Sequence, residues 1–196
     1  EENIMPLGAN KAAIMGVAGV STADVVLLGT TTSTGATLTI TGLDSTYSHY
    51  VFVGNPIHPA TNDVDCVFQV RQSGETSYDN ELVSSGHYQA NSGAGSEEGP
   101  LNTTQAYSAN ATSAIRLVSS IRNLNYAHGT FELILFNPAN TTYVTNWMSK
   151  GSNSGTGANE WQASGYFNIT GAVDAIQFSM TSGDFGDATV KHWGIK

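Results

Sequence analysis

Tyr47-Ser48-His49-Tyr50-Val51-Phe52-Val53, followed by Gly54-Asn55-Pro56-Ile57-His58-Pro59, is the stretch that favours an all-β fold. Aromatic and β-branched side chains in its first half alternate with period two, as they do on a strand that buries one face. Pro56 and Pro59 have no backbone N–H to donate to a sheet. We therefore expect this strand to end near Asn55.

Similar strand signals recur along the chain from residue 24 onward. The spacing of residues 25–28 and 36–40 favours a hairpin, and we expect residues 66–72 to pair with residues 82–90 across a turn at 73–77. Residues 130–136 have the strongest pattern of a core strand. Further strands are expected at residues 103–108, 142–148, 160–170, 175–180 and 188–195, and Gly/Ser-rich loops at 91–99 and 151–157. The short apolar run at residues 115–118 fits either a strand or a helix, and we assign it as a strand because its neighbours are strands.

About ten short strands with almost no helical periodicity predict an antiparallel β-sandwich of jelly-roll type over residues 23–196. Residues 1–22 differ from the rest, because they are rich in Ala and Gly and show no clear period. We expect an extended N-terminal arm that orders against a neighbouring subunit, and a frayed terminus is the alternative. The apolar residues expected to make the contacts of this arm are Leu7, Ile14, Met15 and Val17.

The composition limits the classes of partner. A formal net charge of -9 with only seven Lys and Arg residues argues against nucleic acid, because phosphate binding needs clustered cations. No apolar run of 18 residues and no secretory signal are present, so neither membrane insertion nor cleavable export is expected. Charged residues make up 12% of the chain, which leaves a neutral polar surface suited to packing against copies. The single Cys66 lies in a strand pattern and is expected to be a buried, inert thiol.

No residue pattern of an enzyme is present. The five histidines lack the spacing of a metal pair, and no Gly-x-Ser-x-Gly elbow occurs. Glu132 and Glu160 are candidates for the paired carboxylates of a glycosidase, but the sequence does not place them together. We therefore expect a protein that is not an enzyme.

Two weaker alternatives concern ligand binding. Asp63 with Asp65, and Asp184 with Asp187, present oxygen atoms of the kind that Ca²⁺ uses, whereas ordinary turn chemistry explains the same residues. Trp161 and Tyr88 flank Gly/Ser-rich loops, where an exposed ring could stack on a sugar, and core packing is the competing explanation.

Four further pieces of the sequence belong together: Gly42-Leu43-Asp44-Ser45-Thr46-Tyr47, Tyr50, Ile57-His58-Pro59-Ala60-Thr61 and Ser73-Gly74-Glu75-Thr76-Ser77-Tyr78. With these pieces the chain resembles a group of structural proteins from marine and freshwater bacteriophages, which look like tail-fibre or virion-surface subunits. The resemblance spans residues 24–196, and Met5-Pro6-Leu7-Gly8-Ala9-Asn10-Lys11 is similar to the usual start of that group, although four residues precede it here.

The resemblance implies a structural subunit of a virion, on a tail fibre or as a capsid decoration, made in the cytoplasm of the host cell. Its expected partners are copies of itself, with a homotrimer as the usual assembly, and other virion proteins. The alternative function is a carbohydrate-binding module that recognises a glycan on the host surface. No cofactor is expected apart from the Ca²⁺ alternative.

Overall fold

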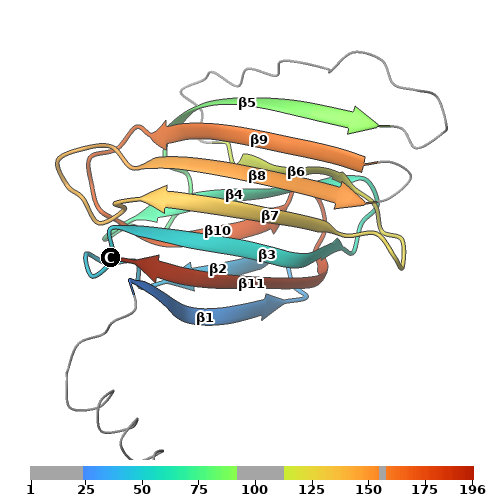
Figure 1. Cartoon of the computed structure of the whole chain (residues 1–196), viewed down its shortest axis with the longest axis horizontal. Coiled ribbons are helices and arrows are strands. Elements are labelled where there is room, and N and C mark those ends of the chain that lie inside the picture. The colour runs from blue at the N-terminus through green and yellow to red at the C-terminus, as the bar shows by residue number, and fades with distance from the viewer. Residues whose placement is uncertain (1–23, 92–112, 155–157) are drawn as a thin grey trace, which may run out of the picture.

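The computed structural model describes residues 24–91, 113–154 and 158–196, apart from the side chains of residues 88–91 and 158. In these residues every regular element is a β-strand, as the sequence predicted (Figure 1). The strands are β1 (Val25–Ser33), β2 (Thr37–Thr41), β3 (His49–Pro59), β4 (Val64–Gln72), β5 (Leu82–Asn91), β6 (Ile115–Ile121), β7 (Gly129–Phe136), β8 (Asn146–Ser154), β9 (Ala158–Phe167), β10 (Val173–Met180) and β11 (Phe185–Ile195).

The described strands form two sheets in which all neighbours are antiparallel. One sheet has seven strands in the order β1-β11-β3-β7-β8-β9-β5, and the other has four in the order β2-β10-β4-β6. Figure 1 looks at the outer face of the seven-stranded sheet, with the four-stranded sheet behind it. The prediction of a sandwich of antiparallel sheets is confirmed.

Two predicted strand pairings are wrong. β1 and β2 do not form a hairpin, because β1 joins the seven-stranded sheet and β2 the four-stranded one. Likewise β4 pairs with β10 and β6, whereas β5 pairs with β9. In both places the short connection carries the chain from one sheet to the other, which allows each strand to bury its apolar face against the opposite layer.

The core lies between the two sheets and is rich in aromatic rings. Phe178 of β10 packs against Phe52 of β3 and Phe131 of β7, with ring centroids 6.0 and 5.2 Å away. Phe68 of β4 packs edge-on against Trp147 of β8 at 5.4 Å. Each of these contacts joins one sheet to the other, so the aromatic side chains hold the sandwich together, each worth roughly 2 to 3 kcal/mol of burial.

β3 continues past the predicted end at Asn55 and reaches Pro59. Ile57 still pairs with Ala188 on one side and Gly129 on the other. Both ladders shift register between Gly54 and Ile57, so Pro56 falls in an irregularity where no regular backbone donor is needed. Pro56 therefore marks a bulge inside the strand, and Pro59 is the last residue of the strand.

Other strand boundaries in the structure also differ from the predicted ones. The loop predicted over residues 151–157 is wrong in its first part, because β8 extends through Ser154. The strand predicted at residues 142–148 begins only at Asn146, after a turn in which the N–H of Asn140 donates to the carbonyl oxygen of Asn137. The predicted strand at 103–108, most of the loop at 91–99 and the arm at 1–22 lie outside the described residues.

Candidate functional site

Side chains on the outer face of the seven-stranded sheet fall into rows, because paired residues of neighbouring strands point to the same side. One row crosses five strands, and each of its residues pairs with the next: Leu27, Trp193, Val51, Ile134 and Met148. All five are apolar and none is fully buried. A continuous apolar stripe therefore runs across the solvent side of the sheet.

A second row lies beside the first, two residues along each strand, and passes through Val25, Ile195, His49 and Phe136. The rings of His49 and Phe136 are in contact, with centroids 5.8 Å apart. We call the apolar residues of the two rows the apolar face, which lies at the end of the sheet where Figure 1 marks the C-terminus. Its members are Val25, Leu27, Val51, Ile134, Phe136, Met148, Trp193 and Ile195.

The apolar face is well exposed at its margins. Val25 and Leu27 on the edge strand are 54% and 55% exposed, and Met148 on β8 is 47% exposed. Contiguous apolar patches bordered by polar residues are typical of surfaces that bind another protein. The apolar face is thus the strongest candidate for an interaction surface in the described part of the chain.

A polar groove of about 770 Å³ occupies another part of the same outer face. Lys150 Nζ lies 3.0 Å from Glu132 Oε2, and the hydroxyls of Thr130 and Ser152 are 3.2 Å apart. The groove has the volume of a small-ligand site. Its other polar residues include Asn55, Asn159 and Glu160.

The structure brings Glu132 and Glu160 to this one groove, which the sequence could not do. Each carboxylate already has a donor from a neighbouring side chain. Glu132 forms the ion pair with Lys150, and Glu160 accepts a hydrogen bond from Gln162. Carboxylates paired in this way suit a polar binding surface, and neither pair by itself indicates acid-base catalysis.

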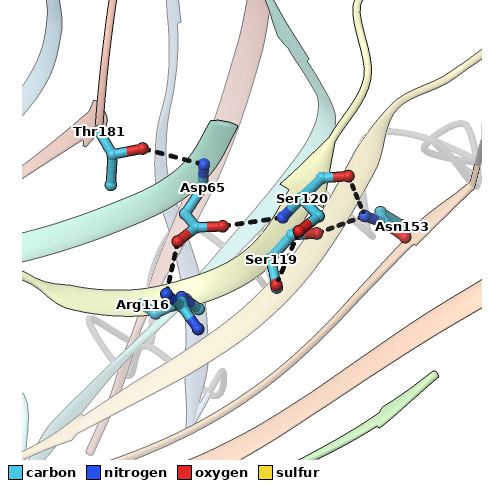
Figure 2. A network of polar contacts seen from close by, with 6 residues as sticks. All are labelled: Asp65, Arg116, Ser119, Ser120, Asn153 and Thr181. Carbon is cyan, nitrogen blue, oxygen red and sulfur yellow. Dashed lines mark hydrogen bonds and ion pairs between the residues drawn. The ribbon is translucent and has the colours of Figure 1, made fainter. Parts of the chain in front are cut away.

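Asp65 belongs to a polar network that joins three strands of the core (Figure 2). Its Oδ2 lies 2.7 Å from the Arg116 guanidinium, and its Oδ1 accepts a hydrogen bond of 2.8 Å from the N–H of Ser120. Ser120 has a positive φ of 50°, and its carbonyl oxygen accepts from Asn153 of β8 at 3.0 Å. The Asp65 carboxylate therefore fixes an irregular turn of β6.

The four acids considered as Ca²⁺ ligands do not form a metal site in the described residues. The loops that contain them lie side by side, because the N–H of Ala60 donates to the Asp184 carbonyl and that of Thr181 to the Asp65 carbonyl. Even so, no three His, Cys, Asp or Glu side chains of the described ranges are grouped to hold an ion. Asp63 and Asp187 thus lie at the same end of the sandwich, but they do not belong to a common group of metal-binding side chains in the described residues.

Trp161 is 2% exposed, so its ring is not available for stacking on a sugar. The guanidinium of Arg116 lies over the indole at 5.2 Å, which connects Trp161 to the network of Asp65. Burial of Trp161 agrees with the core-packing alternative. Tyr88 pairs with Trp161 through the backbone, but its side chain lies outside the described residues.

The predicted contact residues of the arm, Leu7, Ile14, Met15 and Val17, also lie outside the described residues. Cys66 is fully buried, as expected, and burial raises the pKa of its thiol far above the ordinary range. The most exposed aromatic rings of the described residues are Tyr126 and Tyr143, at 69% and 73%, both in loops that flank β7.

The sequence reasoning missed the apolar face, although a signal was present. In Phe131-Glu132-Leu133-Ile134-Leu135-Phe136 both sides of the strand are apolar at one end. Such a run indicates a strand with apolar residues on two faces. Because the opposite sheet covers only one of those faces, Ile134 and Phe136 remain on the outside.

Comparisons with protein-family models, curated proteins and solved structures found no significant match to this chain. The described residues include no helix that is long and apolar enough to cross a membrane.

Proposed function

We propose that this chain is a non-enzymatic structural subunit of a bacteriophage virion, on a tail fibre or as a capsid-surface decoration. In this proposal it assembles into a homo-oligomer, with a trimer as the usual form for such appendages, and its place is the virion. The apolar face is the single observation that carries the proposal. Its half-exposed side chains would each gain roughly 1 kcal/mol from being covered, which gives a closed assembly a driving force.

The proposal includes a jelly-roll architecture with an N-terminal arm. It is supported by the path of the chain, because successive strands alternate between the two sheets from β1 to β7 and again from β9 to β11. The resemblance of the segments around Tyr47 and Pro59 to phage structural proteins supports the same assignment. The neutral polar surface of a chain with 12% charged residues suits repeated contacts between copies.

The test is the mass and symmetry of the purified full-length chain by light scattering and negative-stain imaging, beside Met148→Glu. A charge at Met148 would lie inside any interface that covers the apolar face, so we expect this variant to dissociate. Ser85→Glu is the matched control, because Ser85 lies on the same outer face, in line with Met148 but two strands away. A full-length chain that stays monomeric at high concentration would count against assembly.

A second candidate is recognition of a host glycan, and the polar groove is the observation that favours it. The side-chain amide of Asn55, the hydroxyl groups of Thr130 and Ser152 and the carboxylate of Glu160 are suited to hydrogen bonding with the hydroxyl groups of a sugar. Glycan-array binding that is lost in Ser152→Ala but kept in Ser164→Ala would support it, since both serines are exposed on the outer face and Ser164 lies outside the groove. Binding by neither variant nor parent would leave assembly as the function.

A further inference from the structure

The apolar face continues to the point where the described chain begins. Val25 and Leu27 belong to the face, lie on β1, and are among the most exposed large apolar residues of the described chain. β1 is an edge strand, since within the described residues it pairs only with β11. The 23 residues before Asp24 therefore join the sandwich at a corner of the apolar face.

These 23 residues have the composition of a partner for such a face. They include Ile4, Met5, Leu7, Ile14, Met15, Val17 and Val20, but only three charged residues, Glu1, Glu2 and Lys11. Methionine adapts its shape to irregular apolar surfaces. Twenty-three residues are too few to build a core of their own, so these apolar side chains need a surface elsewhere.

The reach of the segment is sufficient to leave its own subunit. At about 3.3 Å per residue, 23 residues span up to roughly 75 Å. Seven strands at about 4.8 Å spacing make a sheet roughly 29 Å wide. The segment can therefore extend from the edge strand of one sandwich and cross the face of the next.

We infer that the apolar face is the docking site for the N-terminal segment, residues 4–20, of a neighbouring copy of this chain. The inference rests on the proposed function, because an arm that crosses to a neighbour both covers the apolar face and links the copies. An arm held on its own sandwich would cover the face without contributing to assembly. Each copy gives one arm and receives one, which is the head-to-tail arrangement that closes into a ring.

The test is cross-linking between two versions of the full-length chain, one carrying Met15→Cys in the segment and the other Met148→Cys on the face. The two are purified separately, distinguished by a tag, mixed, and treated with a short bis-maleimide. We expect a product containing one chain of each version. Cys66 gives no background because it is fully buried, and the unmodified chain serves as the blank.

Thr37→Cys is the control for the face, since Thr37 is exposed on β2 of the other sheet. Its mixture with the Met15→Cys chain should give no product above the blank. Equal cross-linking to Thr37 and Met148, or no cross-linking to either, would overturn the inference. A product formed only inside a chain that carries both Met15→Cys and Met148→Cys would also overturn it, because the segment would then occupy its own face.

Deletion of residues 1–23 separates this inference from the proposed function. We expect the truncated chain to be monomeric, with the apolar face open to a hydrophobic dye. If the truncated chain forms the same oligomer as the parent, and Met148→Glu still dissociates that oligomer, the body of a second copy covers the face. This result would refute the docked segment but keep the proposal of assembly. A monomer for the full-length chain would refute both.

Discussion

Gly151→Ala should destabilise the sandwich by about 3 kcal/mol, although it adds only a single methyl group, because that group would point inward from a buried position. Gly151 lies on β8, where the backbone of the seven-stranded sheet passes close to β6 of the other sheet. A Cβ at this position would overlap the carbonyl oxygen of Leu117 and lie 3.1 Å from Val118 Cγ2. Carbon atoms prefer separations of 3.5 to 4.0 Å, so the strands would have to move apart.

The size of the effect depends on how easily the two strands can separate. The added Cβ would overlap backbone atoms of β6 instead of a flexible side chain, and both β6 and β8 are held by antiparallel neighbours. Overpacking of this kind typically costs about 1 to 3 kcal/mol and occasionally more. For a domain of this length, about 3 kcal/mol corresponds to a fall in Tm of roughly 6 to 12 °C.

The assay is equilibrium urea unfolding followed by tryptophan fluorescence, with Tm from calorimetry. Gly35→Ala is the matched control, because a Cβ there would meet only Ser33 Oγ at 3.9 Å. That variant should stay within about 0.5 kcal/mol of the parent. A Gly151→Ala variant that loses under about 1 kcal/mol with an unchanged m-value would show that the two sheets do not approach as closely as described.

Three further predictions concern buried polar groups. Arg116→Met should cost about 1 to 3 kcal/mol in urea unfolding, since the Asp65 carboxylate, largely buried, would lose its ion pair; an unchanged stability would show that the network is not needed. Burial lowers the pKa of His192 below its ordinary value of 6.5, so the unfolded chain binds a proton first and stability should fall as the pH drops through 6.5. The Tm of His192→Phe should fall less between pH 7.5 and 5 than the Tm of the parent. The control is His87→Asn, at an exposed position, and its Tm should fall as much as that of the parent; an equal fall in all three proteins would contradict the assignment of this pH dependence to His192. Cys66 should react with a thiol reagent only at the rate of unfolding, because it is fully buried and its pKa is raised, and rapid labelling of the native chain would disprove its burial.

The candidate site was only partly predictable. Glu132 and Glu160 were predicted as candidate paired carboxylates because both lie in strand patterns. In the structure β8 lies between their two strands, and neither strand's sequence predicts that arrangement. Asp65 was considered with Asp63 because they are neighbours in sequence. Its actual partners, Arg116 and the N–H of Ser120, come from a strand far along the chain, and no local pattern indicates such a contact.

The sequence by itself determined that this chain is built from strands, because alternation of apolar and polar residues is a local property with period two. It predicted the burial of Cys66 and strands within β7 and β10 for the same reason, whereas the strand within β6 was assigned only from its neighbours. Which strands pair was decided only by the tertiary structure, since every antiparallel strand offers a similar backbone ladder. β1 and β2 thus separate into different sheets, and β3 runs on through Pro56 at a bulge. The apolar face also needed the tertiary structure, because a strand with two apolar sides does not indicate which side the opposite sheet will cover.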